Sequence, residues 1–165
     1  MHLEQMHLLL TYLLLSTLAP PPADFSGTWV FSEVRPGPPG VRDGSNQSGV
    51  VGLRPADVVI TQTATTLVTE TRPLDTVIRC TFNLTGAEST NHSGAVTFVT
   101  RTRWAGATLV TEGSKSQVTS QGYAEWKWKE IRSLDGQGRM LVETHHTATD
   151  GTVTSATQVW TRKAR

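Results

Sequence analysis

Histidines, carboxylates and one cysteine are the side chains of this chain that could do acid–base, nucleophilic or metal chemistry. His145 and His146 form the only adjacent histidine pair. Neighbouring residues of a strand point to opposite faces, so a regular strand cannot bring both rings to one metal ion. The sequence has no H-x-x-x-H or H-E-x-x-H spacing, and we therefore predict no metal site. Glu143 shares the face of His145 and not that of His146. If the protein is an enzyme, the candidate catalytic residues are His146 and Glu130, each on the even-numbered face of its strand.

Cys80 is the only cysteine of the chain, which excludes an intramolecular disulfide and a zinc site built from cysteines. It lies in the run TVIRCTFNL, which is typical of a strand. We expect a buried structural thiol, because the surrounding sequence offers no evident means of lowering its pKa. A nucleophile elbow, a phosphate-binding glycine-rich loop and a paired-carboxylate motif are also missing from the sequence. No cofactor is predicted.

Aromatic and apolar residues at even-numbered positions could line a ligand cavity, because alternate residues of a strand share a face. The candidate ligand-binding residues are Phe98, Trp104, Trp126, Trp128 and Val142. Ligand pockets are mostly apolar with a few placed polar groups, which agrees with this set. Gly122 and Ala124 share the face of Trp126 and are small enough to leave space. The alternative is an ordinary core, because small barrels fill their interior with side chains.

The elements that carry these residues are expected to be strands. Threonine and valine are frequent from Phe25 onward, and no stretch shows the sustained apolar period of a helix. In Val96–Trp104 the odd-numbered face carries Arg101 and Arg103, so the even-numbered face should point inward. In Thr76–Leu84 the pattern does not decide which set of side chains points inward: Val77, Arg79 and Thr81, or Ile78, Cys80 and Phe82. The expected strands are Gly27–Glu33, Asp57–Gln62, Thr66–Thr71, Thr76–Leu84, Ala95–Trp104, Thr108–Glu112, Ser116–Arg132, Arg139–His146 and Thr152–Arg162.

Turn residues between the strands predict how the strands connect. Ala-Gly in WAGATLV, and Asp-Gly in LDGQGRM and in ATDGTV, are short hairpin signals, because type I′ turns need positive φ. The C-terminal half should therefore be a meander. Short strands with one apolar face need a closed or nearly closed sheet, because closure buries that face and removes unpaired edges. We predict an all-β fold, an antiparallel up-and-down β-barrel of about eight or nine strands. The Gly- and Pro-rich Arg35–Pro55 is expected to be a solvated loop or a flap over the barrel mouth.

The composition of the chain is that of one globular domain. The 165 residues, 37% of them hydrophobic, fit one domain, and a net charge of +1 with scattered Lys and Arg predicts no nucleic-acid partner.

The N-terminal segment predicts where the protein is located. Leu8–Leu18 is an apolar run of signal-peptide length, too short to span a bilayer. We expect residues 1–23 to be a signal-like segment, cleaved after Ala23 or retained as an anchor, and 24–165 to be the barrel. The protein should then be secreted or periplasmic, without a stable membrane span after processing.

The segment DFSGTWVF carries the most informative motif. Its Gly27 and Trp29 resemble the Gly-x-Trp start of the lipocalin and fatty-acid-binding superfamily. The resemblance implies that Trp29 plugs the closed end of the barrel and that Arg162, in the last strand, packs over its ring. The ordered pieces WAGATLV, SLDGQGRMLV and VWTRK also resemble small secreted bacterial lipocalin-like proteins.

Three functions follow as hypotheses. The first is an exported lipocalin-like protein that binds a small hydrophobic molecule inside the barrel. The second is a barrel cyclase or isomerase acting on a hydrophobic substrate, with His146 or Glu130 assisting. The third is a structural or interaction barrel with a filled core and no ligand. The sequence does not indicate an oligomeric state.

Overall fold

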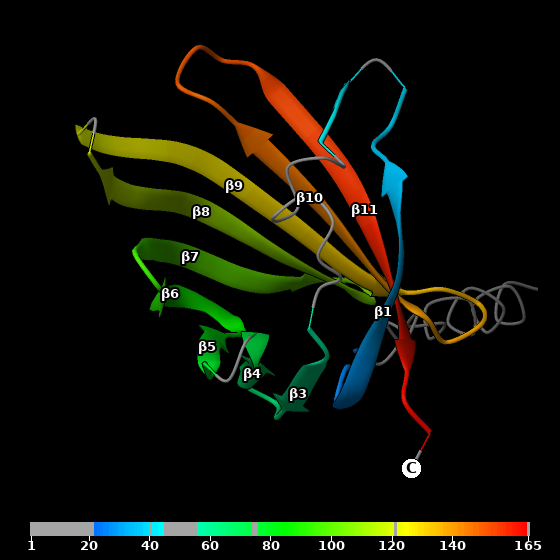
Figure 1. The fold of residues 1–165 in the computed structure, drawn as a ribbon. Helices are drawn as coiled ribbons and strands as arrows, with labels where there is room; N and C mark the ends of the chain where they lie inside the picture. Colours follow the sequence, from blue (N-terminus) through cyan, green and yellow to red (C-terminus); the bar gives the residue numbers. More distant parts are fainter. Residues whose placement is uncertain (1–21, 40, 45–55, 74–75, 121, 165) are drawn as a thin grey trace, which may run out of the picture.

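The computed structural model describes residues 22–39, 41–44, 56–73, 76–120 and 122–164. Eleven strands and no α-helix are found in this part of the chain (Figure 1). The strands are β1 (Gly27–Pro36), β2 (Arg42–Asp43), β3 (Val58–Gln62), β4 (Thr66–Thr71), β5 (Ile78–Asn83), β6 (Thr85–Ser93), β7 (Val96–Ala105), β8 (Thr108–Thr119), β9 (Gly122–Leu134), β10 (Met140–Thr147) and β11 (Val153–Arg162). Over the same residues, the structure contains no helix that is both long and apolar enough to cross a bilayer.

The strands form one sheet, with the order β5-β4-β3-β1-β11-β10-β9-β8-β7-β6. Each ladder along this path is antiparallel, while the two-residue β2 pairs in parallel with β11. Because β1 lies between β3 and β11, the first strand joins the last, and the sheet curls into a nearly closed barrel (Figure 1). The predicted antiparallel up-and-down barrel and the C-terminal meander are confirmed. The strand count exceeds the predicted eight or nine.

Side chains close the barrel where its two edge strands meet. Strands β5 and β6 are the ends of the sheet and lie next to each other. The Thr81 amide donates to Oδ1 of Asn91 at 2.7 Å, and Nδ2 of Asn91 donates to the Thr81 carbonyl at 2.9 Å. The Asn83 amide donates to the Ser89 hydroxyl at 2.9 Å. The buried Asn91 thus takes the place of a backbone partner, which satisfies an edge that would otherwise be unpaired.

One strand of the structure was not predicted and one predicted strand is wrong, each for an identifiable reason. Strand β6, with the sequence TGAESTNHS, is polar and contains a glycine, so its composition is that of a loop. It is a strand because it pairs with β7 and carries the residues that meet β5. The single strand predicted over Ser116–Arg132 is two strands, since β8 ends at Thr119 and β9 begins at Gly122. Gly122 has a φ of 116°, a conformation that side chains disfavour.

The three predicted hairpins are present, but one turn differs from the expected type. Gly106 and Gly151 have positive φ, as the Ala-Gly and Asp-Gly signals predict. In the turn after β9, the positive φ is at Gly138 and not at the Gly136 of Asp-Gly. The Asp135 carboxylate accepts from the backbone amides of Gln137 and Arg139, each at 2.9 Å. This capping supports a longer loop than a two-residue turn.

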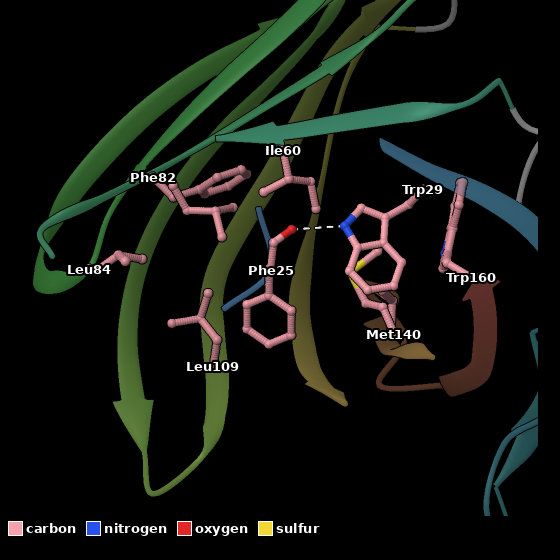
Figure 2. Close-up of a cluster of buried hydrophobic side chains, with 10 residues drawn as sticks. Phe25, Trp29, Ile60, Phe82, Leu84, Leu109, Met140 and Trp160 are labelled. Atoms are coloured by element: carbon pink, nitrogen blue, oxygen red, sulfur yellow. Dashed lines mark hydrogen bonds between the residues drawn. The ribbon is translucent and has the colours of Figure 1, made fainter. Parts of the chain in front are cut away.

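The hydrophobic core packs inside one end of the barrel, and Figure 2 shows its side chains. It contains Phe25, Trp29, Ile60, Leu67, Phe82, Leu84, Leu109, Met140, Val142 and Trp160. The Trp29 side chain is fully buried, and its Nε1 donates to the Phe25 carbonyl at 2.8 Å (Figure 2). The Arg162 guanidinium lies 4.7 Å from the centroid of the Trp29 ring and donates to the Asp24 carbonyl at 2.8 Å. Gly27 lies beside it, at the start of β1.

Candidate ligand-binding site

Cross-strand pairing identifies the side chains that face the barrel interior, because directly paired residues lie on the same face of a sheet. The face of the buried Trp29 includes Arg162 of β11 and continues through β10, β9 and β8 to β7. Beyond the packed end, this interior face carries Phe98, Thr100, Lys115, Trp126, Trp128, Glu130, Arg132, Val142, Thr144, His146 and Thr154. The even-numbered faces predicted to point inward for Val96–Trp104 and around Trp126 do so.

An aromatic wall lies on this interior face. The Phe98 and Trp128 rings meet edge to face, with centroids 5.9 Å apart. Trp128 is buried, whereas Trp126, two residues nearer the mouth, is half-buried. Val142 is buried in the adjoining core. Trp104 instead lies at the closed end, where it stacks on Phe25 with centroids 6.0 Å apart. The structure thus brings Phe98, Trp126 and Trp128 to one wall, and it places Val142 in the core and Trp104 against it.

Arg132 is a buried cation on the same face. Its side chain is only 9% exposed, and its Nη2 donates to Oε1 of Glu130 at 2.6 Å. The Nε and Nη1 atoms of Arg132 are buried and have no hydrogen-bond partner among the described residues. A buried donor without a partner costs free energy comparable to that of a lost hydrogen bond, and more when the group is charged. The guanidinium is therefore left with donors for an acceptor that the described residues do not supply.

Two further buried polar atoms on this face lack a partner in the described part of the chain. They are the Trp128 indole Nε1 and the Thr100 hydroxyl. Gly113 pairs with both residues, so all three lie in one row across β7, β8 and β9. Because an indole N–H only donates, it needs an acceptor from outside this set. The interior thus presents unpartnered donors from Arg132 and Trp128 beside aromatic surface.

Lys115 is a second cation on the interior face. Its Nζ lies 4.4 Å from the centroid of the Trp128 ring and 5.2 Å from that of Phe98. Burial lowers the pKa of Lys115 from 10.5 to about 8, and the negative charge of Glu130 opposes this change. Among the described residues, no carboxylate lies within 4.0 Å of its ammonium group.

His146 lies nearer the barrel mouth. It pairs with Trp128 and Thr154, so its ring is on the interior face. Burial, followed by the charges of Lys115 and His145, lowers the pKa of His146 from 6.5 to about 4. The ring is therefore neutral at physiological pH. A pocket of about 400 Å³ at the mouth is lined by Arg42, Ala124, Glu125, Trp126, His146, Ala148, Thr149, Asp150, Thr152 and Thr154.

The two candidate catalytic residues do not form a pair in the described structure. Glu130 binds Arg132, and no hydrogen bond joins it to His146. On the outer face, Nε2 of His145 lies 2.7 Å from Oε1 of Glu143, in agreement with the expectation that these two residues share a face. The described residues contain no group of three or more His, Cys, Asp or Glu side chains that could hold a metal ion.

The remaining candidate residues divide between the two faces. Cys80 pairs with Thr69 on the interior face, where burial, together with the charge of Glu130, raises the pKa of its thiol. The thiol is therefore protonated at physiological pH. Arg79 points outward and lies 3.9 Å from Glu70. Arg101 and Arg103 are on the outer face, as expected, and pair with glutamates.

Sequence reasoning missed Lys115 and Arg132. Arg132 lies on the same face as Trp126 and Trp128. Continuing the even-numbered face from Trp128 through Glu130 would have identified it. Lys115 was assigned to no strand, because one predicted strand ends at Glu112 and the next begins at Ser116. In the structure β8 continues through these residues.

Comparison with known proteins supports the fold. No protein-family model matches the chain, and no curated protein matches it by sequence. Among solved structures, human cRBP IV is similar with a TM-score of 0.54 and 16% sequence identity, over 86% of this chain and 100% of that chain. A mutant of the fluorescent protein UnaG is similar with a TM-score of 0.50 and 15% identity, over 86% of this chain and 97% of that chain. The chain therefore has the same kind of antiparallel β-barrel fold as these two proteins.

Proposed function

We propose that this protein binds a small, largely apolar molecule with an anionic group, such as a carboxylate, inside its barrel. The observation that carries the proposal is Arg132, a buried guanidinium on the interior face with two nitrogen atoms that have no partner among the described residues. Arginine binds carboxylates through parallel N–H donors, which gives both strength and orientation. The cellular retinol-binding protein cRBP IV, whose name refers to a small apolar ligand, has the same fold.

The charges of the interior favour an anion. On the interior face of β7 to β10, as far as the structure describes it, Lys115 and Arg132 are cationic and Glu130 is the only carboxylate. Lys115 is largely protonated at pH 7, since its pKa is about 8. One positive charge is therefore unbalanced in a poorly solvated interior, where an opposite charge is strongly favoured.

The surrounding surface supports an apolar body for the ligand. Phe98, Trp126 and Trp128 form the wall beside the two cations. The mouth pocket of about 400 Å³ shares Trp126 with this wall and is otherwise lined mainly by polar residues; its volume is within the range of small-molecule sites, about 300–1,000 Å³. Arg42 lines this pocket, and the Gly44 amide donates to the Ser155 carbonyl at 2.8 Å. The described residues of the Arg35–Pro55 segment thus pair with β11 and border the mouth; residue 40 and residues 45–55 are outside the described part.

The test compares dodecanoate, below its critical micelle concentration, with dodecanol, below its solubility limit, by calorimetry and tryptophan fluorescence. We expect dodecanoate to bind more tightly than dodecanol, and Arg132→Met to remove that preference. Hydrogen bonds to a charged group contribute about 1.5–3 kcal/mol, so dodecanoate affinity should fall about 10- to 150-fold.

Two variants control this experiment. Arg101→Met removes an exposed arginine on the outer face and should leave both affinities unchanged. Because Arg132→Met leaves Glu130 buried without its partner, a double variant with Glu130→Gln restores a neutral interior at this position. Equal binding of dodecanoate by the wild type and both Arg132 variants would contradict the proposal, as would no binding of either probe.

We also propose that the protein is exported, as in the secreted bacterial family that its motifs resemble. The apolar run Leu8–Leu18 supports this proposal; residues 1–21 lie outside the described part of the structure. After expression with the leader, the intact mass should correspond to a chain that begins at Asp24. A full-length chain found only in the cytoplasm would contradict export.

A further inference from the structure

Lys115 is the only lysine of the chain on the interior face. The other three, Lys127, Lys129 and Lys163, are on the outer face of β9 or beyond the end of β11. Side-chain exposure is 43% for Lys129 and 62% for Lys163. Lys115 instead lies over the Trp128 ring, in a part of the barrel lined by Phe98 and Trp126.

This environment makes the amine available as a nucleophile. With a pKa of about 8 in place of 10.5, the neutral fraction of the amine at pH 7 is about 300-fold larger than that of an ordinary lysine. The titratable group that acts on the amine is Glu130 on β9, whose negative charge opposes the effect of burial. On β10, Lys115 lowers the pKa of His146, which is neutral well above pH 4 and therefore adds no charge.

We propose that Lys115 is a covalent attachment site, at which an apolar aldehyde forms a reversible imine. This inference rests on the proposed binding of apolar molecules in the barrel. The lysine nitrogen forms a bond to the aldehyde carbon, and the carbonyl oxygen takes up a proton to give a carbinolamine. That intermediate loses water as the C–O bond breaks and the C=N bond forms. No oxidant or reductant is required.

The groups around Lys115 match the needs of this reaction. The Trp128 N–H and the Thr100 hydroxyl lie one row deeper on the same face and lack partners among the described residues, so each can donate to a carbonyl oxygen. Glu130, which also binds Arg132, places a negative charge near a protonated imine. The aromatic wall limits access of water, which slows hydrolysis of the imine.

The test uses dodecanal as the probe, at pH 7, with cyanoborohydride to reduce any imine to a stable amine. Intact mass and peptide mapping then locate the dodecyl group. We expect one adduct, at Lys115, that is lost in Lys115→Arg, which retains a cation but forms no imine at this pH. Lys127→Met is the matched control, because Lys127 is on the outer face in the row next to Lys115, and it should retain the adduct.

Binding of dodecanoate to the same samples separates the two proposals. Adducts spread over Lys127, Lys129, Lys163 and the α-amino group, with none favoured at Lys115, would overturn the inference. So would the absence of any adduct while dodecanoate still binds, in which case the proposed function stands. Absence of both adduct and dodecanoate binding would overturn both proposals.

Discussion

Replacing Lys115 with methionine is expected to stabilise the ligand-free protein at neutral pH. Burial lowers the pKa of Lys115 from 10.5 to about 8, which means that folding disfavours its charged form. Below pH 8 the folded protein carries this charge at a cost. The cost disappears as pH rises from about 8 to 10.5, because the folded state releases the proton before the unfolded state does.

The two pKa values determine the size of the effect. The linkage relation gives a cost of about 3 kcal/mol at pH 7 and about 1.4 kcal/mol at pH 9.5. The free energy of unfolding of Lys115→Met should therefore exceed that of the wild type by about 3 kcal/mol at pH 7, and the difference should shrink by about 2 kcal/mol at pH 9.5. Urea unfolding followed by tryptophan fluorescence measures both values.

The matched control is Lys127→Met, which removes an exposed lysine of the outer face. It should change the free energy of unfolding by less than about 0.5 kcal/mol at either pH. The reasoning is refuted if Lys115→Met is less stable than the wild type at pH 7. It is also refuted if the difference between the two proteins does not depend on pH.

Two further predictions concern the seam between β5 and β6 and the interior histidine. Asn91→Ala removes both side-chain bonds to Thr81, so the free energy of unfolding should fall by about 1–3 kcal/mol, and acrylamide should quench the interior tryptophans faster; unchanged stability and quenching would mean that these bonds do not hold the seam. The pKa of His146 is lowered from 6.5 to about 4, so the unfolded state binds the proton first as pH falls through this range, and the wild type should lose stability relative to His146→Gln. Equal loss in both proteins, measured by urea unfolding at pH 7 and pH 4.5, would contradict this assignment.

Alternation within single strands predicted much of the barrel. Arg101 and Arg103 on one face of a short segment were enough to orient β7, because a strand has a period of two and one of its faces is solvated. The same argument placed Trp126 and Trp128 inside. Turn residues predicted the meander, since positive φ at Gly106 and Gly151 is a local property of the chain.

Other elements depend on partners that are distant in sequence. Strand β6 has a polar, loop-like composition, and it is ordered by pairing with β7 and by the bonds that Asn91 makes to β5. The turn at Gly136 was predicted from Asp-Gly alone, whereas the Asp135 carboxylate shifts the positive φ to Gly138. Such capping competes with the local preference of a dipeptide.

The sequence by itself determined the strand periodicity, the turn positions and the presence of a Gly-x-Trp start, because these depend on residue type and spacing. Only the tertiary structure decided that Lys115 of β8 and Arg132 of β9 share an interior with Glu130 and the Trp128 ring. The pKa of Lys115 depends on burial and on the charge of Glu130, which another strand supplies. For that reason the candidate binding residues Lys115 and Arg132 could be identified only from the folded structure.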